Sequence, residues 1–254
     1  MKLSLSNGIF SKLGLEKNFA LVKRLGFENI EFNMKTVRKE NDTAVYGAKK
    51  LLDASGLKCL TLHSATLHVK DEVEVHRAVY YGKISLEFAR RLSAPIMTVH
   101  SNISKKLPQE ARDRCLALIF NELNEYAKSL NIKLALENLS YTSTGFGKNV
   151  NQLEEVLSII DDGDMGITFD FCHALETKQT ANLLEKYGMR ICNVHMSNKS
   201  HKPFTQENQE LTSFLTKLHE YGYEGPITLE LEHRTPIEEI AKSKALFDKL
   251  LNEF

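Results

Sequence analysis

The sequence predicts an α/β protein of the (β/α)8 TIM-barrel class, with a single domain that spans residues 1–254. Short apolar runs recur eight times along the chain, and segments with helical periodicity lie between them. About thirty residues separate one apolar run from the next, which is the length of a βα unit. A chain of 254 residues also suits one such barrel, for which about 250 residues are typical. The sequence shows no linker, low-complexity tract or second domain.

The apolar runs are the expected strands. In chain order they are KLSLS from Lys2, NIEFN from Asn29, KCLTLHS from Lys58, PIMTVHS from Pro95, KLALENLS from Lys133, MGITFDF from Met165, ICNVHMSN from Ile191 and PITLELEH from Pro226. Because helical segments alternate with them, we expect the strands to be parallel. Eight units favour a closed barrel over a doubly wound open sheet, which more often has fewer strands. No GxGxxG turn follows the first run.

The segments between the runs are the expected helices. In residues 110–131, for example, apolar side chains recur at helical spacing and share one face: they are Leu116, Ile119, Phe120, Leu123 and Ala127. Glycines precede several strands, in RLGFENI, ASGLKCL and YGYEGPI, which is typical of helices that end in a left-handed cap.

The composition is that of a globular protein with a substantial core, because hydrophobic residues make up 42% of the chain and charged residues 26%. Lys and Arg together number 33, as do Asp and Glu, so the formal charge is zero. Proteins that bind nucleic acid usually carry a basic excess, because neutralising phosphates supplies much of their affinity. A nucleic-acid partner is therefore the less favoured alternative, although a local basic patch stays open.

The cysteines and the N-terminal sequence bear on location. Cys59, Cys115, Cys172 and Cys192 lie far apart and form no CxxC pair, which argues against a zinc ribbon or a redox dithiol. The opening MKLSLSNGIF reaches polar residues too early for a signal peptide, and no run approaches the ~18 apolar residues of a membrane span. We therefore expect a soluble cytoplasmic protein with reduced thiols and no membrane partner.

Polar residues close six consecutive expected strands, from the third to the eighth: they are His63, His100, Glu137, Asp170, His195 and Glu230. The carboxyl ends of the strands in a parallel barrel open onto one face, where the catalytic groups of such enzymes lie. Side chains two residues apart on a strand share a side. Asp170 is therefore expected beside Thr168, and His195 beside Asn193, on the side of the barrel axis.

This convergence predicts a metal centre. A single acid at a strand end is more often a loop acceptor or a helix N-cap, and a lone histidine is mostly structural. Three carboxylates that meet three imidazoles need a cation between them, because buried unpaired charges cost several kcal/mol. Carboxylate and imidazole without thiolate suit one divalent ion such as Zn²⁺, Mn²⁺ or Co²⁺. We expect Cys172 to contribute packing rather than ligation.

For other polar residues expected on this face, two interpretations stay open. Lys105 and Lys106, which follow the fourth strand, are either solvated loop charges or contacts for an anionic group. Residues 141–149, YTSTGFGKN, form either a flexible connection or a loop whose glycines allow close approach to a ligand. His68 and His76 are expected on the surface.

The segments LALEN, GITFDFCHA, NVHMSN and ITLELE resemble the xylose isomerase-like barrel superfamily, which contains sugar isomerases and epimerases as well as endonuclease IV. The resemblance covers essentially the whole chain. It implies that Glu137, Asp170, His195 and Glu230 bind one divalent ion. It also implies a role for His173, which corresponds to a substrate contact in the epimerases and to a ligand of a further zinc in endonuclease IV.

The resemblance to each branch of the superfamily has departures. His63 and His100 match positions that endonuclease IV uses with the shared Glu137, so a second ion at His63, His100 and Glu137 stays open. Endonuclease IV also carries an Asp-x-His pair after the seventh strand, where this sequence has Lys199 and His201. Ketose 3-epimerases place an arginine where His201 stands and a second glutamate where Ser143 stands.

Taken together, these features favour a metal-dependent sugar or sugar-phosphate isomerase or epimerase acting on a small molecule. Glu137 and Glu230 would exchange a proton through an enediolate. His173, His63, His100, His201 and Lys105 would contact substrate. The alternative is a zinc-dependent apurinic-site phosphodiesterase like endonuclease IV, and a third hypothesis is a barrel that only binds a metal or small ligand. The number of bound metal ions would separate the first two hypotheses.

Overall fold

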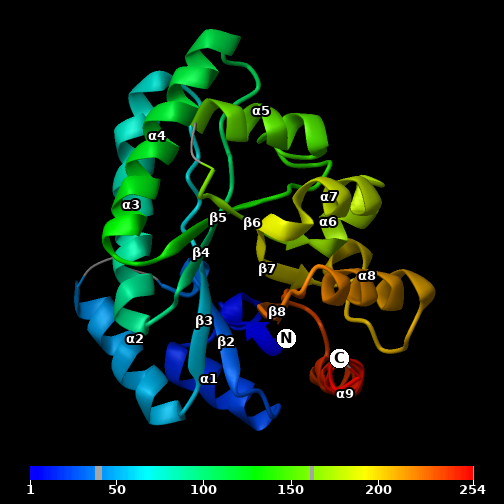
Figure 1. Cartoon of the computed structure of the whole chain (residues 1–254). Coiled ribbons are helices and arrows are strands. Elements are labelled where there is room, and N and C mark those ends of the chain that lie inside the picture. Colours follow the sequence, from blue (N-terminus) through cyan, green and yellow to red (C-terminus); the bar gives the residue numbers. More distant parts are fainter. Residues whose placement is uncertain (38–41, 161–162, 254) are drawn as a thin grey trace.

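The computed structural model describes residues 1–37, 42–160 and 163–253. Within them, eight parallel strands form a closed barrel in chain order, and β8 pairs back with β1 (Figure 1). The strands are β1 (Lys2–Ser6), β2 (Asn29–Asn33), β3 (Lys58–His63), β4 (Ile96–Val99), β5 (Lys133–Glu137), β6 (Gly166–Asp170), β7 (Ile191–Met196) and β8 (Pro226–Leu229). The predicted (β/α)8 barrel is confirmed.

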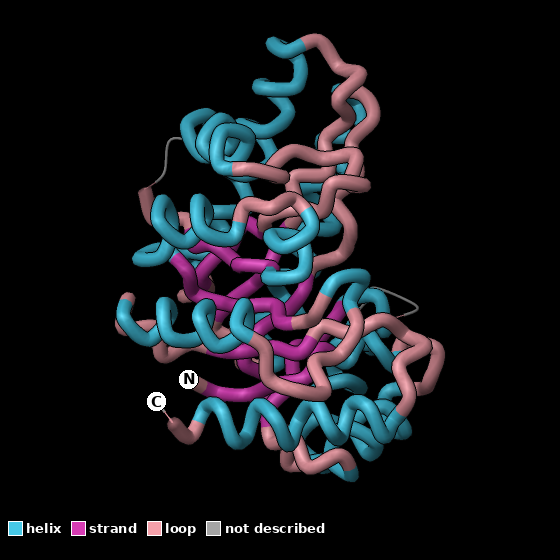
Figure 2. Tube along the Cα trace, turned by 90° about the vertical axis from the view of Figure 1, so that its right-hand side faces the viewer, coloured by secondary structure: helices cyan, strands magenta, loops and turns pink. Residues whose placement is uncertain are grey.

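Helices surround the strands on the outside, as the tube view in Figure 2 shows, and both chain ends lie on the same side of the barrel. The α-helices are α1 (Leu15–Arg24), α2 (Asp42–Ser55), α3 (Val75–Leu92), α4 (Gln109–Ser129), α5 (Val150–Ile160), α6 (Phe171–Glu176), α7 (Thr180–Tyr187), α8 (Gln209–Glu220) and α9 (Ile237–Leu251). Short 3-10 helices are η1 (Asn7–Phe10), η2 (Met34–Thr36), η3 (Glu72–Glu74), η4 (Gly188–Arg190) and η5 (Lys199–His201). None of the helices in the described residues is long and apolar enough to cross a membrane.

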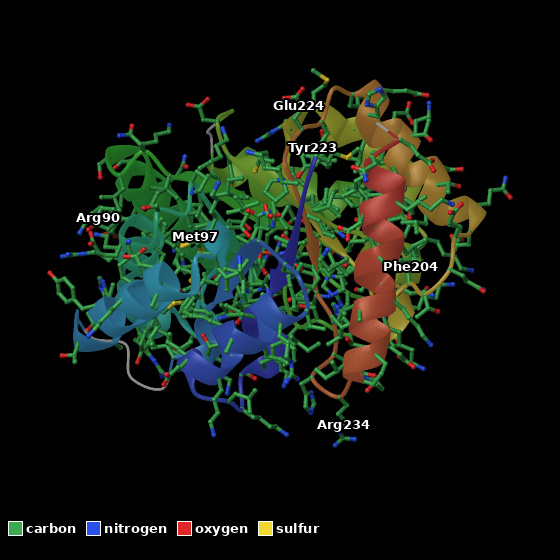
Figure 3. All side chains as sticks on the ribbon, turned by 90° about the horizontal axis from the view of Figure 1, so that it is seen from below. Arg90, Met97, Phe204, Tyr223, Glu224 and Arg234 are labelled. Atoms are coloured by element: carbon green, nitrogen blue, oxygen red, sulfur yellow. The ribbon has the colours of Figure 1, made fainter. Side chains whose placement is uncertain are left out.

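The main core lies between the strands and the helix layer. The apolar face predicted for residues 110–131 is buried in α4, and α4 packs against α3 at Gly82. A Cβ atom at Gly82 would lie 2.6 Å from the methyl groups of Leu123, so only glycine permits this close approach of the two helices. In Figure 3, Phe204 lies beside α9, and its ring centroid is 6.4 Å from that of Phe247 on that helix.

The inside of the barrel is filled by small polar side chains rather than by a second apolar core. Ser4 and Thr228 are joined by a 2.7 Å hydrogen bond between their hydroxyls, and Thr98 and Thr168 by one of 2.8 Å. The Asn193 side chain donates to the Thr98 hydroxyl at 3.2 Å. This connected layer confirms the predicted inward register and supports the residues one layer closer to the carboxyl ends of the strands.

One strand ends earlier than the sequence suggested. The expected strand ran through Phe171, but β6 ends at Asp170 and α6 begins at Phe171. The physical reason is local, because the Asp170 side chain accepts a hydrogen bond from the backbone N–H of His173 and caps the helix. Cys172 therefore lies within a helix, where it is fully buried.

Candidate metal centre

Four predicted ligands meet at the carboxyl ends of the last four strands. Glu137 and Asp170 end β5 and β6, His195 lies in β7, and Glu230 directly follows β8. One ligand atom of each lies within 4.8 Å of those of the other three. His195 Nδ1 is 3.2 Å from Glu230 Oε2, 3.5 Å from Glu137 Oε2 and 3.9 Å from Asp170 Oδ2. We call Glu137, Asp170, His195 and Glu230 the central cluster.

Unused polar atoms show that the central cluster fits a cation. Glu137 Oε1, Asp170 Oδ2 and His195 Nδ1 are buried and have no hydrogen-bond partner. Buried polar atoms are nearly always paired, and leaving carboxylate oxygens without a partner is costly. A divalent ion would satisfy all three atoms at once. Three carboxylates and one imidazole are a suitable donor set for Zn²⁺, Mn²⁺ or Co²⁺.

Asp170 has a different task for each of its oxygens. Oδ1 accepts the His173 backbone N–H at 2.7 Å and caps α6, whereas Oδ2 points to the central cluster. Asn138 fixes the backbone of this aspartate from the neighbouring strand end, because its side chain accepts the Asp170 N–H at 2.7 Å and donates to the Asp170 carbonyl at 2.9 Å. Both readings weighed for this acid, helix cap and ligand, are therefore compatible.

The charges of the central cluster are unevenly compensated. Burial raises the pKa of the Asp170 carboxyl. Burial also acts against the ionisation of Glu137 and Glu230, yet the pKa of each lies well below its usual range. His100 and His195 lower the pKa of Glu137, and His195 lowers the pKa of Glu230. The pKa of His195 lies well above its usual value despite burial, because several carboxylates surround the ring. The cluster thus carries an excess of negative charge that suits a cation.

Two histidines extend the cluster on the side of β3 and β4. His100 Nε2 donates to Glu137 Oε2 at 2.8 Å, and His63 Nε2 lies 3.6 Å from the same oxygen. The His63 ring stacks on the His195 ring, with centroids 5.7 Å apart. Burial lowers the pKa of His63, which keeps this imidazole neutral and able to ligate. His63, His100 and Glu137 form a second group that could hold an ion.

A third group comprises Asp170, His173 and His201. His173 Nδ1 donates to the Asn138 carbonyl at 2.9 Å, which leaves its Nε2 for a ligand. His201 follows Ser200 in η5, and both have a positive φ, of 51° and 59° respectively. Left-handed backbone at non-glycine residues is strained and tends to occur at functional sites. Although burial acts in the opposite direction, Asp170 raises the pKa of His201.

A cavity of about 630 Å³ opens above these groups. Its wall includes Glu230 and His201 together with Ser6 and Asn33 from the ends of β1 and β2, and Tyr141 from the segment after β5. Lys105, which was expected to contact substrate, belongs neither to the cavity wall nor to the three groups. Its ammonium lies 5.7 Å from the centroid of the Phe146 ring and is near enough to Lys148 to lower the pKa of that lysine.

A family model described as xylose isomerase-like TIM barrel matches residues 19–250. The chain belongs to this family. The resemblance inferred from the strand-end segments is therefore confirmed.

Several known proteins resemble this xylose isomerase-like barrel. The uncharacterized protein MJ1311 of Methanocaldococcus jannaschii is 29% identical over 178 residues, which cover 66% of this chain and 60% of that protein. A D-tagatose 3-epimerase-like protein (TM-score 0.83, 23% identity) covers 100% of this chain and 98% of its own. L-ribulose 3-epimerase has a TM-score of 0.83 and 14% identity, and the match covers 100% of this chain and 95% of that one. IolI protein with a zinc atom bound has a TM-score of 0.79 and 18% identity, and the match covers 100% of this chain and 99% of that one. At these identities the structures show the shared fold.

Glu31 is a site residue of this xylose isomerase-like barrel that the sequence analysis missed. It lies on β2, is fully buried, and its Oε2 is 2.8 Å from His195 Nε2. Because a carboxylate accepts only, His195 Nε2 carries the proton and Nδ1 is left to face the central cluster. Thr61 donates to the same Glu31 oxygen at 3.0 Å. The sequence contains one indication of this role, because Glu31 is an acidic residue within the apolar run NIEFN.

Proposed function

We propose that this protein is a metal-dependent isomerase or epimerase of a sugar or sugar phosphate. The observation that carries the proposal is the placement of two glutamates on one ligand cluster. Glu137 and Glu230 come from β5 and from the end of β8, and both approach His195 Nδ1. The likeness in fold to L-ribulose 3-epimerase and to a D-tagatose 3-epimerase-like protein supports the same reaction class.

A divalent ion held by the central cluster would act as a Lewis acid toward a hydroxy-carbonyl substrate and acidify its C–H bond. Glu137 and Glu230 are the bases that exchange this proton. One carboxylate removes the proton to give an enediolate, and the other returns a proton to the opposite face of the same carbon. The low pKa described above for each glutamate keeps the accepting carboxylate ionised. The other glutamate must first take up a proton before it can return one to the substrate.

The remaining residues orient and enclose the substrate. His173 presents Nε2 because its Nδ1 is tied to the Asn138 carbonyl, and His201 is fixed in the cavity wall by its backbone, which accepts the Glu232 N–H at 3.0 Å. His63 and His100 lie beside Oε2 of Glu137, whereas His173 lies beside Oε1 of the same carboxylate. These imidazoles are suited to hold hydroxyl groups beside the reacting carbon.

The decisive test is Glu230→Gln, compared with Glu232→Gln as a matched control. Glu232 is exposed and also lines the cavity, but it belongs to none of the three groups. We expect Glu230→Gln to lower epimerisation by about 10²–10⁴-fold, which is the usual contribution of a general acid or base, and to retain less metal after dialysis against a chelator. Glu232→Gln should keep both properties. Normal turnover by Glu230→Gln would refute the assignment.

One observation favours a second candidate, a zinc-dependent phosphodiesterase that cleaves at abasic sites. His63 and His100 lie at Glu137, and His173 and His201 lie at Asp170, so that three groups of residues that could each hold an ion adjoin one another. Several ions could then share the site and activate a water for attack on a phosphodiester. Elemental analysis decides between the candidates: one ion per chain without cleavage of abasic DNA supports the epimerase, and two or three zinc ions with cleavage support the nuclease.

A further inference from the structure

Two lysine side chains meet beside the barrel mouth, outside the three metal-ligand groups. Lys105 lies between β4 and α4, and Lys148 lies between β5 and α5. The two ammonium groups lie close enough for Lys105 to disfavour the charge of Lys148, and Lys148 Nζ donates to the Tyr141 carbonyl at 2.6 Å. The nearby Arg112 is paired with Glu155, but across residues 1–37, 42–160 and 163–253 neither lysine forms an ion pair with a carboxylate.

A tightly built loop carries Lys148 to this position. The Phe146 N–H donates to the Ser101 carbonyl at 3.2 Å, and the Ser101 hydroxyl donates to the Phe146 carbonyl. Gly145 packs directly on the Ser101 carbonyl, so closely that any Cβ atom there would clash. Gly147, with φ +111°, accepts the Leu139 N–H at 2.9 Å. The segments after β4 and β5 are therefore fastened to each other, and the lysine pair is attached to that junction.

The Phe146 ring organises the charges of the junction. The Lys105 ammonium lies 5.7 Å from the ring centroid, and the Arg112 guanidinium lies 4.3 Å from it. Cations are attracted to an aromatic face, which holds Lys105 near Lys148 although the two repel each other. Partial burial, followed by the contact with Lys105, lowers the pKa of Lys148. An anion between the two ammonium groups would remove the repulsion.

We propose that Lys105 and Lys148 bind the phosphate monoester of a phosphorylated sugar. The inference deepens the proposed function and rests on it for the identity of the sugar. Tyr141, whose carbonyl holds Lys148, forms part of the cavity wall together with Glu230, so the lysine pair adjoins the cavity that leads to the central cluster. Two ammonium groups match the charge of a phosphate dianion. The zero formal charge of the chain favours a small dianion over a nucleic-acid backbone.

Binding of inorganic phosphate tests the site without requiring turnover. Isothermal titration calorimetry would compare the wild type with Lys105→Met, Lys148→Met and Lys106→Met. Lys106 is the matched control, because it is an exposed lysine of the same segment that is not part of the pair. We expect the first two substitutions to weaken phosphate binding at least about tenfold and the third to change it less than about twofold. Equal affinities in all four proteins, or no binding by the wild type, would overturn the proposal.

Kinetics separate this inference from the proposed function. The wild type should have a higher kcat/KM for a ketose phosphate than for the same unphosphorylated ketose, and Lys148→Met should lose most of that preference. Turnover of the free ketose without phosphate binding refutes the lysine site and leaves the epimerase proposal standing. Lysine-dependent phosphate binding without turnover of any sugar supports the lysine site and refutes the epimerase proposal. Lysine-dependent binding of an abasic DNA duplex, with no binding of sugar phosphates, would show that the small-dianion assignment is wrong.

Discussion

Replacing Glu31 by glutamine should weaken metal binding at the central cluster without unfolding the barrel. Glu31 does not reach the cluster itself. It accepts the proton on His195 Nε2 and so fixes the tautomer that directs Nδ1 toward Glu137, Asp170 and Glu230. Partners of this kind orient a metal-ligating histidine and raise its basicity.

The size of the effect follows from the bond that changes. The 2.8 Å contact between Glu31 and His195 is fully buried and involves a carboxylate. A hydrogen bond to a charged group contributes about 1.5–3 kcal/mol and a neutral one about 0.5–1.5 kcal/mol. Glutamine keeps an acceptor oxygen of similar size and loses the charge, so the loss is about 1–1.5 kcal/mol. That corresponds to roughly tenfold weaker metal binding.

Competition with a chromophoric chelator would measure this change for Zn²⁺, and thermal unfolding would confirm that the variant is folded. Thr61→Val is the control. It removes the 3.0 Å hydrogen bond to the same Glu31 oxygen and leaves the bond to His195 in place, so its metal affinity should change less than about threefold. Wild-type affinity in a folded Glu31→Gln protein would refute the reasoning. An equal loss in both variants would show that packing around Glu31, rather than its charge, matters.

Two further predictions concern the scaffold and the thiols. Gly145→Ala should lower the free energy of unfolding in urea by about 1–3 kcal/mol, because the added Cβ would lie 2.8 Å from a Leu139 methyl group and still closer to the Ser101 carbonyl. Gly47→Ala is the control: Gly47 lies in α2 with open space around it, so this substitution should raise the stability by up to about 1 kcal/mol. Equal stabilities of the two variants would contradict this expectation. Burial raises the pKa of Cys192 to about 12, so at pH 8 only about one Cys192 thiol in ten thousand is ionised. Alkylation of Cys192 in the folded protein should therefore be slow, and its rate should rise about tenfold per pH unit. Reaction of Cys192 at the rate of an unfolded control would contradict this prediction.

The fold could be predicted because its signals are local and repeated. Each βα unit carries its own apolar strand, its helical periodicity and its terminating residues, so errors in one unit do not alter the class. The alternation of side chains along each strand predicted that Thr168 and Asn193 face the inside of the barrel, where both form hydrogen bonds with Thr98. The convergence of Glu137 and Asp170 follows from the same geometry, since neighbouring parallel strands open onto one face.

The missed features depend on contacts between distant parts of the chain. Glu31 and His195 are 164 positions apart, and nothing within NIEFN shows that a buried imidazole awaits this acid. The pairing of Lys105 with Lys148 likewise arises only when the segments after β4 and β5 meet. At Asp170 the error was of another kind. Strand propensity continued through Phe171, and a helix cap made by a single side chain outweighed it.

Because the two oxygens of Asp170 have different partners, the proposed metal binding can be separated from the capping of α6. Asparagine caps a helix about as well as aspartate, because the cap requires only an acceptor oxygen. A single exchange of one oxygen for an amide nitrogen could therefore leave α6 and the barrel intact while withdrawing one negative charge from the central cluster. Asp170→Asn would thus separate the helix cap from the proposed metal site, because the architecture would persist while the central cluster had one carboxylate fewer.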